Sequence, residues 1–326
     1  MQDIELGNSG LRAPQLGFGC SALLGRSGRS ESLRALAAAW DEGIRFFDTA
    51  RSYGYGESEA LLGEFLAGRR GQAVIATKFG ILAARQSGLK SLAKTVARKI
   101  LAVAPSARSM LQKGAASQFS SNQFTIPVLR QSIEESLRKL GTDCVDMLFL
   151  HAAPASVLDL DDLLYAMGRL VETGKVRIAG LSAELDVVEL AMKRQPPPLL
   201  AMQFPCNVFN IADSAGLAKQ SAGDYVWVAN QPYGGVARVL RCREILRSLV
   251  AKKDMDAVLC EKLGALDDAV FADVVLNVIL RDSGIHVVVP AMMRIEHIRA
   301  NVQAVARSRF SSGEIAQIRQ ALAAVS

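Results

Sequence analysis

The sequence predicts an α/β protein, a (β/α)8 TIM barrel with an N-terminal β-hairpin and a long basic insertion after the third strand. Short apolar or β-branched runs alternate with longer segments of helical period along most of the chain. Eight such runs can be distinguished, and three successive ones end on or next to a polar side chain. With 326 residues, 50% of them hydrophobic, the chain can bury one large core, so we expect a single domain over 1–326.

The predicted elements follow from these periods in chain order. Two short apolar stretches flank Gly7-Asn8-Ser9-Gly10, which predicts a hairpin placed to plug the N-terminal end of the barrel. The predicted strands are 16–19, 45–48, 73–78, 146–151, 176–182, 200–204, 225–229 and 286–290. The predicted helices are 31–42, 58–67, 127–140, 159–173, 184–194, 267–282, 295–306 and 312–324.

Four polar residues stand at or just after three successive predicted strands: Asp48, Tyr53, Lys78 and His151. Singly, each has an ordinary structural interpretation, such as a helix cap for the acid or a surface charge for the lysine. In a parallel barrel, however, the C-terminal ends of the strands converge on the face where catalytic groups are assembled. Their common position therefore indicates an active site.

These residues and three further motifs resemble the aldo-keto reductase superfamily. The motifs are Gly174-Lys-Val-Arg-Ile-Ala-Gly-Leu-Ser182, Met202-Gln-Phe-Pro-Cys-Asn207, and Val287-Val-Val-Pro290 running on to Asn301. The similarity extends from the 6–11 hairpin to the 295–306 helix. It implies hydride transfer between a nicotinamide and a carbonyl or alcohol, with the catalytic tetrad on Asp48, Tyr53, Lys78 and His151.

The residue types of this tetrad suit the implied chemistry. A free tyrosine titrates near pH 10, and a neighbouring ammonium favours the phenolate, so we expect Lys78 to lower the pKa of Tyr53. Asp48 would keep Lys78 charged and oriented, which makes Tyr53 the expected general acid and base. His151 would donate a hydrogen bond to the same carbonyl oxygen and stabilise its developing charge.

The resemblance also implies a cofactor site. It assigns the nicotinamide carboxamide to Ser182 and Gln203, and the adenosine 2′-phosphate to the helix start after strand eight, where free N–H groups favour an anion. The full set of implied cofactor residues is Cys20, Asp48, Ser182, Gln203, Asn230, Arg294, His297 and Asn301. We expect NADP(H), with NAD as the second choice.

Several positions depart from the family pattern. Ala183 stands where many members carry a carboxamide-binding asparagine, and Asn230 stands where many place an aromatic ring under the nicotinamide. Tyr233 and Phe204 are candidates to supply that ring instead. Residues 291–293 are Ala-Met-Met, which leaves Arg294 as the main basic residue for a 2′-phosphate.

The insertion, 79–125, is far longer than a compact barrel needs at this point. It contains seven basic and no acidic residues, against a net charge of +6 for the whole chain. Lys90, Lys94 and Arg98 recur every fourth residue, which predicts a basic amphipathic helix. Such a helix could pack on the barrel with its charges solvated, contact an anionic substrate, cover the pocket as a lid, or bind an acidic partner or a membrane surface.

Other classes are disfavoured. No signal peptide or membrane-spanning run is visible, and five scattered cysteines indicate neither a zinc site nor a disulfide framework, so we expect a cytoplasmic protein without a metal. No nucleic-acid-binding motif accompanies the basic charge. The expected partner is a small carbonyl or sugar substrate. The alternative is a regulatory protein that binds the cofactor and docks through the insertion.

Overall fold

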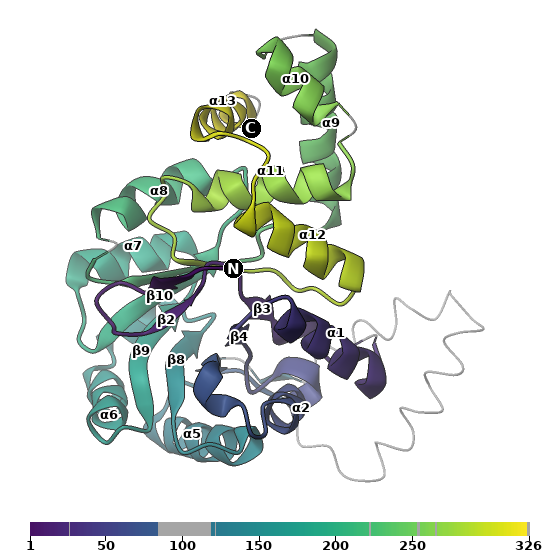
Figure 1. The fold of residues 1–326 in the computed structure, drawn as a ribbon. Helices are drawn as coiled ribbons and strands as arrows, with labels where there is room; N and C mark the ends of the chain where they lie inside the picture. Colours follow the sequence, from purple (N-terminus) through teal and green to yellow (C-terminus); the bar gives the residue numbers. More distant parts are fainter. Residues whose placement is uncertain are drawn as a thin grey trace, which may run out of the picture.

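The barrel consists of eight parallel strands surrounded by helices (Figure 1). The computed structural model describes residues 1–25, 27–83, 119–120, 122–221, 223–252, 255–264 and 266–324. The strands follow one another around the sheet in chain order. They are β3 (Phe18–Gly19), β4 (Phe46–Asp48), β5 (Val74–Phe79), β8 (Val145–His151), β9 (Val176–Ser182), β10 (Leu199–Pro205), β11 (Val226–Asn230) and β12 (Val287–Val289).

The first and last strands meet, so the sheet closes into a barrel. Leu16 forms a parallel bridge with Val288, and the Gly17 amide donates to the Val288 carbonyl at 2.9 Å. A side chain at position 17 would collide with Phe46 and Val289, so glycine is needed for this close approach. The predicted (β/α)8 barrel is confirmed.

Eight helices match the predicted ones within a few residues. They are α1 (Arg29–Asp41), α2 (Ser58–Phe65), α5 (Ile126–Leu140), α6 (Asp161–Glu172), α7 (Leu185–Arg194), α11 (Asp268–Leu280), α12 (Ile295–Ala306) and α13 (Ser312–Ala323). The helix α5 begins at an N-cap, Thr125, whose side chain accepts from the Val128 amide, and it ends at Gly141 in the left-handed conformation.

The structure also contains three helices that the sequence analysis missed: α8 (Ile211–Gln220), α9 (Val236–Lys252) and α10 (Ala257–Leu263). The expectation that these three stretches contain no helix was wrong. In α9, Val236 and Leu240 are 77% and 63% exposed, so its apolar residues are not confined to one face and the usual periodic signal is blurred. The pair α9 and α10 lies beside the barrel, near α13 (Figure 1).

The predicted N-terminal hairpin is present as β1 (Asp3–Glu5) and β2 (Arg12–Pro14), paired antiparallel. Leu6 and Leu11, at its turn, are buried in a cluster with the inward-facing residues of the strands, among them Phe46, Met147 and Val287. This contact buries the apolar turn of the hairpin against the barrel interior. The hairpin therefore plugs one end of the barrel.

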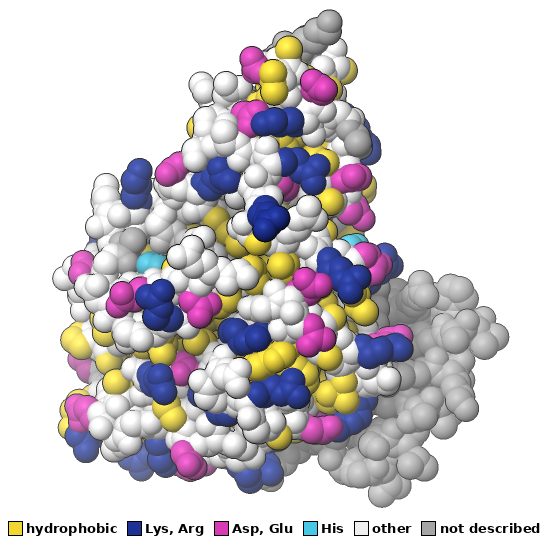
Figure 2. Space-filling model, in the orientation of Figure 1, with side chains coloured by type: hydrophobic (Ala, Val, Ile, Leu, Met, Phe, Trp, Pro, Cys, Tyr) yellow, Lys and Arg dark blue, Asp and Glu magenta, His cyan; other side chains and the backbone are white. Residues whose placement is uncertain are grey.

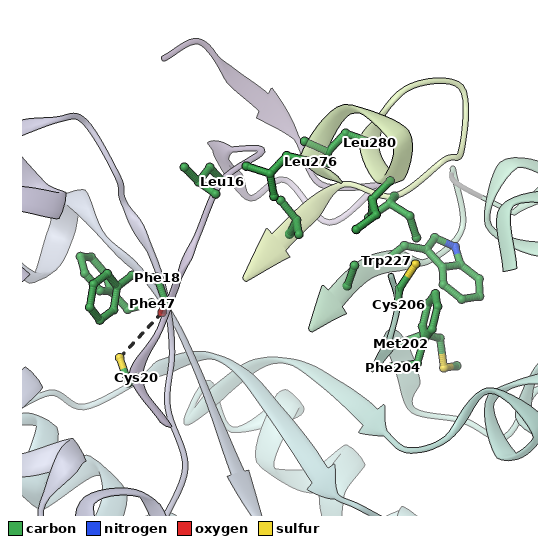
Figure 3. Packing of buried hydrophobic residues seen from close by; sticks show 14 of the residues in the cluster. Leu16, Phe18, Cys20, Phe47, Met202, Phe204, Cys206, Trp227, Leu276 and Leu280 are labelled. Carbon is green, nitrogen blue, oxygen red and sulfur yellow. Dashed lines mark hydrogen bonds between the residues drawn. The ribbon is translucent and has the colours of Figure 1, made fainter. Parts of the chain in front are cut away.

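A second, larger core lies between the strands and the helices around them. Figure 3 shows Trp227, Phe204 and Met202 packed together on the outer side of β10 and β11, and Leu276 of α11 belongs to the same buried cluster. The rings of Phe204 and Trp227 meet edge to face at 5.9 Å between centroids. This layer fixes the strands whose ends carry the polar residues of the site.

The two ends of the insertion pair with each other. β6 (Leu82–Ala83) and β7 (Phe119–Ser120) form an antiparallel ribbon, and Phe79 packs edge to face on Phe124. The predicted basic helix lies outside the described residues. On the face seen in Figure 2, described acidic and basic side chains are interspersed. Among the described helices, none combines the length and the apolar character needed to cross a membrane.

Candidate active site

Lys78 is fully buried and is held by the neighbouring strand. Its Nζ donates to both carboxylate oxygens of Asp48 at 2.7 Å and to the Thr49 carbonyl at 2.9 Å. Burial acts to lower the pKa of Lys78, but the negative charge of Asp48 and the contact with Tyr53 outweigh it, so the pKa is raised. The lysine is therefore an ammonium ion inside the barrel mouth.

Tyr53 lies beside this ammonium, in a short 3-10 helix (Tyr53–Gly56) that follows β4. The Lys78 Nζ is 5.0 Å from the centre of its ring. Burial raises the pKa of the Tyr53 phenol, and Lys78 offsets only part of that effect. Lys78 therefore acts in the expected direction, but burial outweighs it, and the net pKa of Tyr53 is raised rather than lowered.

His151, at the end of β8, completes the group. Its ring meets that of Tyr53 edge to face, with 5.6 Å between centroids. Burial, and secondarily the charge of Lys78, lowers the pKa of His151 to about 3, so the imidazole is neutral at physiological pH. Its Nδ1 atom is buried and has no hydrogen-bond partner among the described residues. A neutral imidazole has one N–H to donate.

These side chains border a cavity of about 340 Å³ at the C-terminal ends of the strands. Asp48, Tyr53 and His151 form one part of its wall. The remaining described lining is Gly19, Ser21, Ala152, Ala153, Ser182, Ala183, Glu184, Pro205, Asn230, Gln231, Val289 and Ala291. The structure thus brings three of the four tetrad residues to one cavity, with Lys78 directly behind them.

Ser182 and Gln203 form a hydrogen-bonded chain to the tetrad that the sequence did not indicate. The Ser182 Oγ donates to Gln203 Oε1 at 2.8 Å, and Gln203 Nε2 donates to Asp48 Oδ1 at 2.9 Å. Ser182 lines the cavity, whereas Gln203 is completely buried behind it. Gln203 therefore braces Asp48 in this structure.

Cys20 is also set back from the cavity. Its neighbours Gly19 and Ser21 line the space, whereas Cys20 is fully buried beside Phe18 and Phe47 (Figure 3). Its thiol points to the Phe18 carbonyl, with 3.8 Å between sulfur and oxygen, and burial raises its pKa. Any contribution of this residue to ligand binding would have to come from its backbone.

The position that often carries a stacking ring is polar here. Asn230 lines the cavity at the end of β11, and its Oδ1 is buried without a hydrogen-bond partner among the described residues. Neither proposed substitute lies in this cavity. Phe204 is packed in the core against Trp227, and Tyr233 lines a second cavity next to it.

The second cavity, about 220 Å³ in volume, lies at the first turns of α12. The Tyr233 hydroxyl donates to Asn301 Oδ1 at 2.5 Å, and its ring stacks on Phe271. His297 also lines this cavity, while Arg294 is an exposed N-cap residue just outside the described lining. The described lining is Tyr233, Val239, Arg243, Asp268, Phe271, Ala272, Ala291, Met292, His297, Ala300 and Asn301.

Arg243 and Asp268 are lining residues that the sequence analysis missed. Arg243 Nη2 lies 2.6 Å from Asp268 Oδ1, and its guanidinium covers the ring of Phe271. Asp268 Oδ2 lies 3.8 Å from His297 Nε2. Arg243 belongs to α9, one of the three helices that were not predicted, so no signal in the sequence connected it to this site.

The two cavities have Ala291 in common, so one elongated ligand could occupy both. The first cavity offers hydrogen-bonding groups, including the unpartnered Asn230 Oδ1 in its wall, and the second offers an aromatic pair beside a helix N-terminus. A flat amide-bearing ring and a phosphorylated nucleoside fit these two environments. The described residues are therefore compatible with a nicotinamide dinucleotide.

Comparison with known proteins identifies the family. A model described as "Aldo/keto reductase family" matches residues 15–323. The chain is 25% identical over 219 residues to aldo-keto reductase YhdN of Bacillus subtilis, covering 64% of this chain and 55% of the relative. It is 36% identical over 162 residues to D-threo-aldose 1-dehydrogenase of Pseudomonas sp, covering 47% and 44%. The aligned part spans about half the length of these curated relatives.

Solved structures share the fold. The holo form of aldo-keto reductase AKR11C1 from Bacillus halodurans superposes with a TM-score of 0.69 at 20% identity, covering 98% of this chain and 96% of that one. A thermostable aldo-keto reductase in complex with the inhibitor epalrestat gives 0.68 at 22% identity, covering 98% and 100%. At these identities the similarity establishes the barrel architecture.

Proposed function

Because the chain belongs to the aldo/keto reductase family, we propose that it is an NADP(H)-dependent oxidoreductase that interconverts a carbonyl and an alcohol, with Tyr53 as general acid and base. The observation that carries this proposal is the position of Tyr53 in the cavity wall, between the buried Lys78 ammonium and His151. Bound NADPH would supply the hydride. The protein's contribution is to orient the substrate and to supply a proton.

Tyr53 is protonated at neutral pH because burial raises the pKa of its phenol. It can therefore donate to an oxygen that acquires negative charge in the cavity. The tyrosinate that remains is stabilised by the Lys78 ammonium, which Asp48 holds in place through both carboxylate oxygens. In the reverse direction, the same tyrosinate accepts the alcohol proton.

His151 has a positioning role in this scheme. With its pKa lowered to about 3, it is neutral and cannot serve as the proton source near pH 7. A single N–H aimed at the substrate oxygen would place that oxygen within reach of Tyr53 and stabilise its charge. The pKa of Tyr53 is raised and that of His151 is lowered. Tyr53 is therefore the proton donor in this scheme, and His151 is the neutral hydrogen-bond donor.

The cofactor assignment remains part of the proposal. Ser182 in the first cavity would contact the carboxamide, Asn230 would lie against the nicotinamide ring, and the adenosine end would bind around the start of α12, at Asn301, His297 and Arg294. The relative yakc of Schizosaccharomyces pombe carries NADP(+) in its name. The positive helix terminus and Arg294 favour the additional phosphate of NADP over NAD.

The substrate class is proposed from the cavity and the relatives. D-threo-aldose 1-dehydrogenase and L-galactose dehydrogenase of Arabidopsis thaliana are named for sugars. The first cavity has both polar and apolar lining and is large enough for a small aldehyde, ketone or sugar. An anionic substrate group would complement the basic residues of the insertion.

The test is binding followed by turnover. Protein fluorescence is titrated with NADPH and NADH, and nicotinamide absorbance is then followed with a panel of aldehydes, ketones and sugars. Cofactor oxidation that is lost in Tyr53→Phe and kept in Tyr55→Phe, a matched change two residues away, is the expected result. Binding without turnover on the whole panel would favour the regulatory alternative. Failure to bind either nucleotide would refute the oxidoreductase proposal.

A further inference from the structure

The turn that carries Tyr53 is tethered on both sides to the outer helix α5. Arg51, two residues before the tyrosine, places its Nη2 2.7 Å from Glu135 Oε2. Gly56, three residues after it, accepts a hydrogen bond from the Lys139 ammonium through its carbonyl oxygen. Glu135 and Lys139 are one helical turn apart, with 3.5 Å between their charged atoms.

Arg51 is connected to a second acid as well. Its Nη1 lies 3.4 Å from Oε2 of Glu59, which is only 1% exposed. The other oxygen of Glu59 accepts from the Thr77 hydroxyl at 2.7 Å, and Thr77 directly precedes Lys78 on β5. The planar fork of Arg51 thus connects the turn to α2, to α5 and to the strand of the catalytic lysine.

This turn needs external support because of its backbone. Gly54 and Tyr55 are both left-handed, with φ values of 58° and 59°, and Tyr55 has a side chain that disfavours this conformation. At Gly63 of α2, a Cβ would collide with the Lys139 carbonyl, so α2 and α5 are in close backbone contact. The short distance between these helices allows one arginine to reach acids on both.

We infer that Glu135 and Lys139, which we call the α5 clamp, are positioning residues that hold the Tyr53 turn through Arg51 and Gly56. This inference rests on the proposed function of Tyr53. Neither residue of the clamp lines the first cavity among the described residues, and neither do Arg51 and Gly56, which they hold. Glu135 and Lys139 affect catalysis indirectly, because the position of the turn sets the position of the Tyr53 phenol relative to Lys78 and His151.

The test compares Glu135→Gln with Glu134→Gln. Glu134 is the preceding residue of α5, is exposed, and pairs with Lys175 away from the turn. In Glu135→Gln we expect kcat to fall about 10- to 100-fold, since small misplacements of a catalytic group have effects of this size, while the KM for NADPH changes little. Hydrogen exchange of the peptide covering 50–57 should become faster. Glu135→Asp should recover part of the loss, and Glu134→Gln should resemble the wild type.

A wild-type kcat in Glu135→Gln, with Tyr53→Phe inactive, would overturn the inference. So would wild-type hydrogen exchange over 50–57 in Glu135→Gln. If Tyr53→Phe remained active, the proposed function would fail instead, and faster exchange would still establish the clamp as a support of the turn. Thermal unfolding of each variant separates these outcomes from a general loss of folding.

Discussion

The Lys78 ammonium lies 2.7 Å from each carboxylate oxygen of Asp48, and both side chains are almost completely buried. A buried charge is tolerated when it is paired and hydrogen-bonded. The pair therefore provides a permanent positive charge beside Tyr53.

The reductive reaction should be insensitive to pH over the neutral range. Reduction needs protonated Tyr53, whose pKa is raised, and neutral His151, whose pKa is about 3. We expect kcat/KM to be constant from about pH 6 to about pH 9 and to decline only above about pH 10. A decline between pH 6 and 8 that persists in His151→Gln would contradict the assignment of Tyr53.

Removal of the Lys78 charge should slow the reaction. Lys78→Met should lower the rate at least about 100-fold while NADPH still binds.

His151 should make the folded state sensitive to acid. The unfolded chain binds a proton near the ordinary value of 6.5, whereas the folded protein does so only at about 3. Stability is therefore lost as the pH falls below about 6.5, with a slope approaching about 1.4 kcal/mol per pH unit from this residue. Urea unfolding between pH 4 and pH 7 should show a shallower slope in His151→Gln.

Arg294 should distinguish the two nicotinamide cofactors. If Arg294 contacts the 2′-phosphate, Arg294→Ala removes one charged hydrogen bond and should raise the Kd for NADPH about tenfold. The Kd for NADH should stay unchanged, because NADH has no 2′-phosphate. Arg299→Ala is the matched control, because Arg299 lies on the same helix and pairs with Glu42 instead. Equal losses for both nucleotides in Arg294→Ala would argue against a 2′-phosphate contact. Fluorescence titration measures both constants.

An aromatic ring introduced at Asn230 should strengthen the binding of the cofactor, because many members of the family have a ring at this position of the first cavity. Because Tyr53 and His151 are the only aromatic rings in the described lining and both belong to the tetrad, Asn230→Tyr should supply a stacking surface and lower the Kd for NADPH about fivefold. Asn230→Leu adds bulk without a polarised ring face and serves as the control. An equal gain with leucine would show that filling space, rather than stacking, is responsible.

The insertion should affect the choice of substrate more than the cofactor. Ala83 and Phe119 are paired in the ribbon of β6 and β7, so 84–118 can be replaced by a two-residue Asn-Gly turn. We expect the relative activities over a panel of neutral and anionic carbonyl compounds to change while the Kd for NADPH stays the same. An unchanged substrate profile would show that the segment serves another purpose.

Much of the site could be predicted because it depends on strand ends. Asp48, Lys78 and His151 each follow an apolar run, and the closure of the barrel brings those ends together. The brace from Gln203 to Asp48 could not be predicted, since it joins residues 155 positions apart through one side-chain contact. The net pKa shift of Tyr53 was also inaccessible, because burial is a property of the folded surroundings.

One side of the second cavity, the start of α12, lies where the sequence predicts the beginning of a helix. The helix start at Arg294 was located because the strand before it, Val287–Val289, has a clear apolar run. Arg243 and Asp268 were missed for a different reason. The exposed apolar residues of α9 hide its period, and only the packing of α9 near α11 brings Arg243 to Asp268.

The N-terminal hairpin has a consequence for the order of events. Because Leu6 and Leu11 close the far end of the barrel, the described part of the chain leaves the opposite mouth as the route to the tetrad. A dinucleotide lying across Ala291 would occupy part of that entrance. If a dinucleotide lies deeper in this entrance than the substrate, we expect ordered kinetics, in which the dinucleotide binds first and leaves last.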